Sequence, residues 1–239
     1  MKRHYELEEA LMRSILEINK KDREGHVKSG RLSASALCKP LLWQVLSYLK
    51  LDSPKNANSI MTMRRGVDME KLVLDYLGFE KPTEDILYRG VIGKLDSFYK
   101  TDDGRYPLEI KSVSRDKFRR ITTAGVPDEQ YAIQAGLYGL ALNTDKFYIM
   151  IVNSTDYRTL CYEMNTQDYK QQIDSKIDSF EFVIKNKIMP RFEANYKFYN
   201  DVKYQDFPAF NSLSPDEIVM KLKMEYPEAY KIWTNNTLV

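Results

Sequence analysis

Apolar side chains recur at helical spacing in the first third of the chain. The pattern predicts helices at about residues 5–20, 33–49 and 59–77. Ser33 and Ser35 are suited to cap the second helix, and Gly78 occupies the C-cap position of the third. The charged, glycine-containing stretch of residues 20–31 predicts a loop between the first two helices.

Two β-rich runs follow, at residues 91–99 and 106–113, and the turn Thr-Asp-Asp-Gly between them predicts a hairpin. Further along, the pattern predicts a basic loop at residues 114–120, a helix at 128–142, and strands at 146–152 and 159–163. A long helix is expected at 167–187, capped by Thr166, and a last helical region begins at Ser214 with Pro215 in its first turn. These C-terminal helices could form an oligomer contact or cover the core.

The order of elements predicts an α/β core with helical segments at both ends of the chain. The chain has 239 residues and 43% hydrophobic content, enough for one substantial core, and no composition shift divides it. We therefore expect a single domain over residues 1–239, with a core at about 32–190 and a C-terminal helical extension at about 191–239.

Charge and cysteine content exclude some classes of protein. The formal net charge is only +2, so a nucleic-acid ligand would need local clusters of basic residues. Cys38 and Cys161 cannot supply the four thiolates of an iron–sulfur cluster. No run approaches the roughly 20 apolar residues of a membrane span, and the first residues lack the apolar segment of a secretory signal. We expect a cytoplasmic protein with no membrane partner.

Candidate chemistry lies on the two β-rich runs. Asp96 belongs to the first run, and Glu109, Ile110 and Lys111 belong to the second. Residues two apart on a strand point to the same face, so Glu109 and Lys111 should lie side by side while Ile110 points into the core. Two carboxylates and substrate oxygens suffice to hold Mg²⁺, and a lysine there could orient or deprotonate a water, or stabilise charge on a phosphate. The alternative is a cross-strand salt-bridge ladder on the surface.

Glu70 is a further candidate, because it lies on or beside the apolar face of the helix at 59–77. A carboxylate there is costly unless it is paired or bound to a metal. Helical spacing defines this face by Met63, Gly66, Val67, Glu70, Val73, Leu74 and Leu77.

Four short motifs in a fixed order carry a resemblance: Gly66-x-x-x-Glu70, Gly93-x-x-Asp96, Glu109-x-Lys111 and Gln134-x-x-x-Tyr138. Together they resemble the PD-(D/E)XK nuclease superfamily, and more narrowly its RecB-type and phage-exonuclease branch (lambda-exonuclease-like or YqaJ-like). The resemblance spans about residues 32–152. It implies a restriction-endonuclease-like core, a small mixed β-sheet flanked by helices, and the hydrolysis of DNA phosphodiester bonds with Mg²⁺ or Mn²⁺ and no iron–sulfur cluster.

The resemblance also implies a biological setting. It suggests an exonuclease of recombination, repair or phage DNA metabolism, acting in a bacterial cell or a phage-infected host on single- or double-stranded DNA. A homo-oligomer or a recombination partner protein would be compatible with it. Glu70 stands where many RecB-type members carry histidine, which favours the phage-exonuclease side and an all-oxygen ligand set.

Roles follow from the resemblance residue by residue. Asp96, Glu109 and the backbone carbonyl of Ile110 would be metal ligands, and Glu70 would bind a second metal or a metal-bound water. Lys111 would contact the nucleophilic water and the scissile phosphate. Gln134 and Tyr138 share one face of a helix and would lie near the DNA strand. Their alternative role is packing on the sheet, with Tyr138 a core aromatic.

Weaker candidates for nucleic-acid contacts are basic or aromatic side chains near these motifs. Each has a plainer alternative, namely a solvated charge run, an ordinary surface pair, or core packing for the tyrosine. They are Arg64, Arg65, Arg115, Lys117, Arg119, Arg120 and Tyr131.

Two other functions stay open at the level of sequence. One is a non-catalytic nucleic-acid-binding or scaffold protein that keeps the nuclease fold, against which the retained acids and lysine argue. The other is a sequence-specific endonuclease, for which no added recognition element can be identified.

Overall fold

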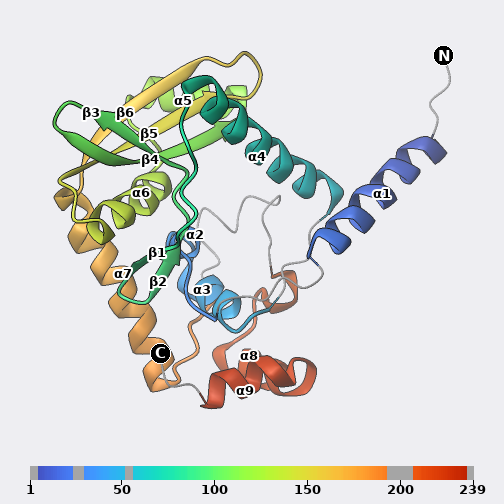
Figure 1. The fold of residues 1–239 in the computed structure, drawn as a ribbon. Coiled ribbons are helices and arrows are strands. Elements are labelled where there is room, and N and C mark those ends of the chain that lie inside the picture. Colours follow the sequence, from blue (N-terminus) through green and yellow to red (C-terminus); the bar gives the residue numbers. More distant parts are fainter. Residues whose placement is uncertain (1–4, 24–29, 52–55, 193–206, 236–239) are drawn as a thin grey trace.

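The computed structural model describes residues 5–23, 30–51, 56–192 and 207–235. Figure 1 shows how the elements of these ranges are arranged. The helices are α1 (Tyr5–Arg23), α2 (Ala34–Leu37), α3 (Leu41–Tyr48), α4 (Ala57–Leu77), α5 (Arg115–Ala124), α6 (Glu129–Ala141), α7 (Gln167–Asn186), η2 (Pro208–Phe210), α8 (Pro215–Glu225) and α9 (Pro227–Asn235). The strands are β1 (Ile86–Tyr88), β2 (Val91–Gly93), β3 (Ser97–Thr101), β4 (Gly104–Val113), β5 (Lys146–Asn153) and β6 (Thr159–Asn165).

The larger sheet in the described part of the chain has the order β3-β4-β5-β6. Strand β4 runs parallel to β5, and the other two pairings are antiparallel. A parallel pair needs a crossover connection, which α5 and α6 supply. The predicted fold class, a small mixed sheet flanked by helices, is therefore confirmed.

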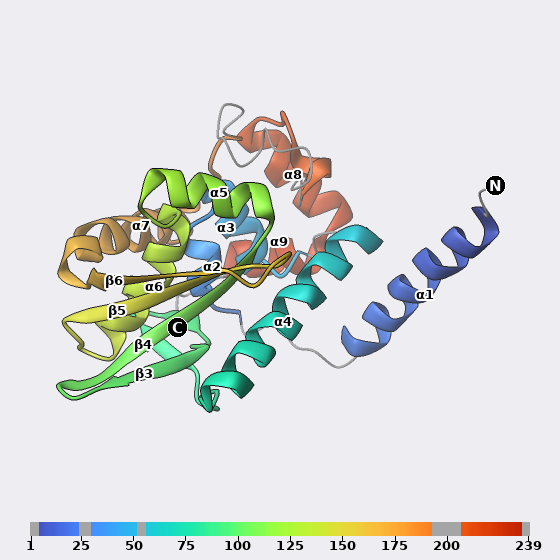
Figure 2. The same ribbon diagram turned by 90° about the horizontal axis from the view of Figure 1, so that it is seen from above.

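Alternation along β4 and β5 directs their side chains into two separate cores. Ile149 and Ile151 of β5 pack with Ala135 of α6, whereas Leu108 and Ile110 of β4 pack with residues of α4. Helices α4 and α6 thus cover opposite faces of the sheet, as the view from above shows (Figure 2). Ile110 is buried, as its place between Glu109 and Lys111 predicted.

The hairpin of β1 and β2 corrects the predicted strand at residues 91–99. Strand β2 ends at Gly93 and pairs with β1, while β3 begins at Ser97 and pairs with β4. The chain therefore leaves one sheet and enters another across residues 94–96, and it cannot be one continuous strand. The backbone amide of Ile92 donates a hydrogen bond to the carbonyl of Leu32 (2.8 Å), which ties this hairpin to the start of α2.

Two helix predictions need correction. The helix expected at 33–49 is divided into α2 and α3 by Pro40, because proline lacks an amide hydrogen and disfavours helical backbone in the residue before it. Residues 114–120, expected as a loop, instead begin α5, whose N-terminus is capped by the Ser114 hydroxyl.

Helix α4 ends at Gly78 in a left-handed conformation (φ 65°), as predicted, but its expected buried face is only partly buried. Met63 and Val67 are 52% and 62% exposed. Only the second half of α4 lies on the sheet, where Met69 and Leu74 pack against β4. Figures 1 and 2 show α1 beside α4 and away from the sheet, and Asp22 of α1 pairs with Arg64 of α4 (3.2 Å).

The C-terminal helices cover the core. Ser214 caps α8 in a capping box, as the Ser-Pro sequence predicted. Ile218 and Leu222 of α8 and Trp233 of α9 are buried in the largest apolar cluster. None of the helices in the described ranges is long and apolar enough to cross a membrane.

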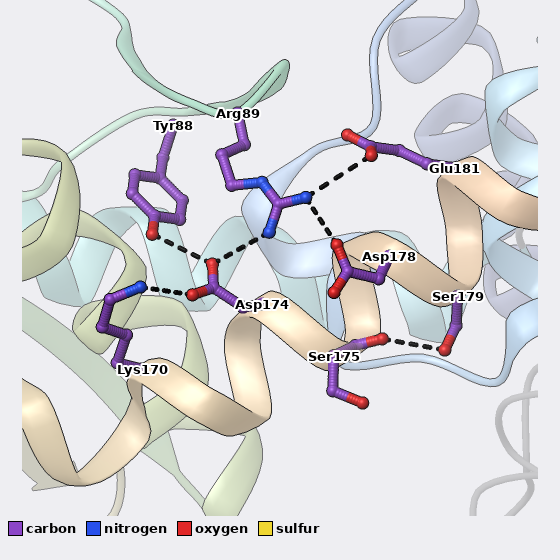
Figure 3. Close-up of polar contacts among 8 residues, drawn as sticks. All are labelled: Tyr88, Arg89, Lys170, Asp174, Ser175, Asp178, Ser179 and Glu181. Atoms are coloured by element: carbon purple, nitrogen blue, oxygen red, sulfur yellow. Dashed lines mark hydrogen bonds and ion pairs between the residues drawn. The ribbon is translucent and has the colours of Figure 1, made fainter.

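An arginine at the tip of the β1–β2 hairpin attaches it to α7 (Figure 3). Arg89 and Gly90 both have positive φ (46° and 79°), which suits a two-residue turn between antiparallel strands. The Arg89 guanidinium contacts three carboxylates one turn apart on α7, at Asp174 (3.2 Å), Asp178 (2.5 Å) and Glu181 (3.4 Å).

Asp174 is the central acid of this cluster. It also accepts hydrogen bonds from the Tyr88 hydroxyl (3.0 Å) and from Lys170. Burial alone would raise the pKa of Asp174, but the hydrogen bonds from Lys170, Tyr88 and Arg89 outweigh it and lower the pKa. A carboxylate with a lowered folded-state pKa stabilises the fold above its unfolded pKa, and that stabilisation is lost as the pH falls toward the folded value.

We predict that Arg89→Gln lowers the free energy of unfolding at neutral pH by about 1 kcal/mol, since three partly exposed carboxylates then face one another unpaired. The difference from the wild type should shrink as the pH falls below about 4, where aspartate protonates in the unfolded chain. Urea denaturation at several pH values measures it. Arg158→Gln, which removes an ion pair with Asp156 in an exposed turn, is the matched control and should leave the free energy of unfolding unchanged. A difference that grew toward acid pH would contradict the assignment.

Candidate active site

An open stretch of β4 edge shapes the candidate site. Strand β3 pairs with β4 only as far as Leu108, where it meets Ser97. Beyond Leu108, no described strand lies on that side of β4, although β5 continues on the other side to Val113. The amide of Ile110 on this edge donates a hydrogen bond to Oδ2 of Asp96 (2.8 Å). The segment between β2 and β3 is thus attached to the edge of β4 by the carboxylate of Asp96.

Glu109 and Lys111 share one face of β4, as their spacing predicted. It is the face covered by α6, because the two residues lie opposite Ile149 and Ile151 of β5. Glu109 is completely buried and forms an ion pair with the Lys111 ammonium, whose side chain is 26% exposed. The second carboxylate oxygen of Glu109, Oε2, has no hydrogen-bond partner among the described residues. A buried carboxylate oxygen without a partner is costly.

Burial and mutual repulsion act on the two acids together. Burial raises the pKa of Asp96 to about 8, and the charge of Glu109 adds to this rise. Burial also raises the pKa of Glu109, although Lys111 opposes it. The pKa of Lys111 is raised, because Glu109 and Asp96 outweigh the burial that would lower it. Lys111 is therefore held as an ammonium. Its single positive charge faces two carboxyl groups, Asp96 and Glu109, and cannot neutralise both.

Glu70 lies near these acids but is engaged elsewhere. Its carboxylate, 18% exposed, forms an ion pair with Lys81 in the segment that follows α4. Its charge contributes to the raised pKa values of Asp96 and Glu109, which places it within electrostatic reach of both. Within the described residues, no three His, Cys, Asp or Glu side chains come together in a group that could hold a metal ion. The structure thus brings Asp96, Glu109 and Lys111 together and leaves Glu70 at the margin.

Gln134 and Tyr138 of α6 are linked to the Asp96 segment by hydrogen bonds. The Gln134 amide donates to the Tyr138 hydroxyl (3.1 Å), which donates to the carbonyl of Lys94 (3.0 Å). The Tyr138 ring is buried, as the packing alternative held. It lies so close to Gly93 that a Cβ there would come within 2.4 Å of its Cε1 atom. Tyr138 is therefore a core aromatic whose hydroxyl holds the segment that carries Asp96.

Most of the weaker candidates are paired with acids. On α5, Lys117 pairs with Asp128 (2.7 Å). Two longer contacts of 3.7 Å join Arg119 to Asp116 and Arg120 to Asp128. On α4, Arg64 pairs with Asp22 of α1, whereas Arg65 is exposed.

A basic hollow lies along α5. Arg115 and Arg119 line it together with Phe118 and Arg158. Arg158 lies in the turn between β5 and β6.

The sequence analysis predicts no role for Arg158 or for Lys81, the partner of Glu70 in the segment after α4. No local pattern marks a residue that folding brings into place from another element.

Comparison with known proteins gives a likeness of fold. No family model and no curated protein matches the sequence. The crystal structure of SSO0001 aligns with a TM-score of 0.54 at 17% identity, over 86% of this chain and 96% of that one. An alkaline exonuclease (LHK-Exo) from Laribacter hongkongensis aligns with a TM-score of 0.48 at 14% identity, over 66% of this chain and 89% of that one, and its complex with dAMP aligns at 0.49. The first likeness shows a shared fold, and the other two are too distant to bear on chemistry.

We predict that Gly93→Ala destabilises the protein by about 1–3 kcal/mol, because a methyl group there overlaps the Tyr138 ring and the Cβ of Ala34. Chemical denaturation measures the loss. Gly66→Ala is the matched control: a Cβ at that helical position meets nothing within 4 Å, so the same change should stabilise α4 by about 0.5–1 kcal/mol. Equal effects of the two substitutions would rule out the close contact as the cause.

Proposed function

We propose that this chain is a metal-dependent DNA nuclease that hydrolyses phosphodiester bonds, and that it acts as an exonuclease. One observation carries the proposal. Two buried carboxyl groups, Asp96 and Glu109, lie beside Lys111 at an open strand edge, and one oxygen of Glu109 lacks a hydrogen-bond partner in the described part of the chain. Acids and a lysine so arranged suit a divalent cation and a phosphate oxygen.

The donor set fits Mg²⁺ or Mn²⁺. Asp96 and Glu109 would supply carboxylate oxygens, the Ile110 carbonyl a backbone oxygen, and Glu70 would act through a bound water or at a second ion. All are hard oxygen ligands, and a divalent cation would offset the cost of burying Glu109. When bound, such an ion would polarise the phosphoryl oxygen and lower the pKa of an attached water.

The chain's own residues would do the rest. Lys111, as an ammonium, would stabilise negative charge on the phosphate and help to orient the attacking water. It would not deprotonate that water, because Glu109 and Asp96 raise the pKa of Lys111 and keep it protonated. Tyr138 and Gln134 would keep Asp96 in place through Lys94. The basic side chains of α5, which begins soon after Lys111, would contact backbone phosphates on either side of the scissile bond.

The substrate and setting rest on the resemblance of the four motifs and not on geometry. The proposed substrate is single- or double-stranded DNA, and the proposed setting is recombination, repair or phage DNA metabolism. A partner protein or a homo-oligomer belongs to the same expectation. The alternative function, a nucleic-acid-binding scaffold, would need neither a buried carboxylate oxygen without a hydrogen-bond partner nor a retained lysine. Calorimetric titration with Mn²⁺ separates the two, since only the nuclease site should bind it and lose that binding in Asp96→Asn.

We predict that Asp96→Asn and Lys111→Met each lower Mg²⁺-dependent degradation of end-labelled DNA by about 10²-fold or more. Each substitution removes a charged side chain that would stabilise the transition state, Asp96 through the metal ion and Lys111 directly. Asparagine keeps an acceptor for the Ile110 amide, so the fold should persist. The control is Asp103→Asn, an acid in the β3–β4 turn that pairs with Lys146 and should leave degradation unchanged. Undiminished degradation in both site variants would sink the assignment.

A further inference from the structure

Tyr131, in the first turn of α6, lies between two lysines. The ammonium of Lys111 is 5.8 Å from the centre of its ring, and that of Lys117 is 4.5 Å from it. The ring packs against the cluster formed by α5, α6 and β5, with Phe118 among its members. Both helices therefore fix the ring beside the lysine of the candidate active site.

The hydrogen of the Tyr131 hydroxyl is free to reach a ligand. Lys117 Nζ lies 2.5 Å from the phenolic oxygen, and an ammonium can only donate, so the tyrosine oxygen accepts this bond. The phenolic hydrogen must then point elsewhere, and no acceptor for it lies among the described residues. Tyr138, on the same helix, differs because its hydroxyl already donates to the Lys94 carbonyl.

Lys117 is itself held in position. Its ammonium pairs with Asp128, the N-cap residue of α6, at 2.7 Å. This contact joins α5 to the start of the helix that carries Tyr131. Lys117 therefore stays beside the Tyr131 oxygen and fixes the direction left for the phenolic hydrogen.

We propose that Tyr131 is the proton donor to the leaving deoxyribose oxygen, with Lys117 as the residue that positions and recharges it. This rests on the proposed nuclease function. In the step, the water oxygen forms a bond to phosphorus and its proton passes to solvent. The bond from phosphorus to the leaving oxygen breaks, its electron pair stays on that oxygen, and the Tyr131 proton moves to it. Lys117 then returns a proton to the phenolate and is itself reprotonated from solvent.

The test is Tyr131→Phe, which keeps the ring and removes the proton. On ordinary DNA the rate at saturating substrate should fall by about 10²-fold, in the range that general acid catalysis contributes. On DNA with sulfur in place of the leaving bridging oxygen, the variant should match the wild type within about threefold, because a thiolate leaves without a proton. Both bridging isomers are made, and the product ends identify the leaving side.

Three further measurements accompany this experiment. Tyr106→Phe alters another tyrosine with a lysine over its ring, Lys146 at 4.7 Å, at the far end of β4, and should leave both rates unchanged. Lys117→Met should show the same dependence on the leaving atom as Tyr131→Phe. DNA binding in EDTA, followed by fluorescence anisotropy, should be unaltered by Tyr131→Phe, because the ring and the neighbouring charges remain.

Each remaining outcome overturns the proposal. Wild-type rates in Tyr131→Phe would mean that the ring serves only to stack on a base or to pack. Equal losses on oxygen and sulfur substrates would mean that the hydroxyl supports the structure and donates no proton. If the wild type cleaved neither substrate, the nuclease function itself would fail, and that result is distinct from a defect confined to the variant.

Discussion

The hydrogen bond from the Ile110 amide to the Asp96 carboxylate determines how the candidate site is built. It exists because β3 stops pairing at Leu108 and leaves the next amides of β4 without a strand partner on that side. A carboxylate then takes the place of a strand carbonyl. The same open edge allows Glu70, from the α4 side of the sheet, to act electrostatically on Glu109, whose side chain lies on the α6 side. A continuous β3 would separate these groups.

Burying two carboxyl groups at this edge has a cost that the remaining contacts reduce only in part. Lys111 supplies one positive charge for Asp96 and Glu109, and Lys81 is committed to Glu70. The raised pKa values of both acids express this shortage of positive charge. A fold that needed only stability would replace such a group with apolar side chains of similar volume. This shortage of positive charge supports the proposal that a divalent cation binds beside Asp96 and Glu109.

Alternation predicted the parts of the fold that local pattern controls. The run at residues 106–113 gave β4, the inward direction of Ile110 and the shared face of Glu109 and Lys111, because period-two burial depends only on neighbouring residues. The sequence pattern does not predict the β1–β2 hairpin, because its strands are only three residues long and Leu87 is 52% exposed, which leaves no clear alternation of buried and exposed positions. Met63 and Val67 followed helical spacing but are exposed, since spacing cannot tell where along a helix the sheet ends.

The site shows the same division between local and long-range information. The order of the acids, the lysine and the Gln134–Tyr138 pair could be read from sequence, because each occupies a fixed place on its own element. The ion pair of Glu70 with Lys81 and the contact of Tyr138 with Lys94 depend on how distant segments meet, and no local pattern encodes them.

Tyr131 illustrates why burial alone is a poor guide to role. From sequence, it was one of 17 tyrosines, and packing was the plainer expectation. Its ring does pack, but the hydroxyl of a packed tyrosine still has one hydrogen and two lone pairs to place. Because Lys117 occupies a lone pair, the direction left for the hydrogen is constrained by the same contacts that fix the ring. Tyr138 faces the same requirement and meets it with a backbone carbonyl, which makes it structural. The difference between these two tyrosines of one helix lies in where each proton can go, and that difference decides which of them is free to take part in a reaction.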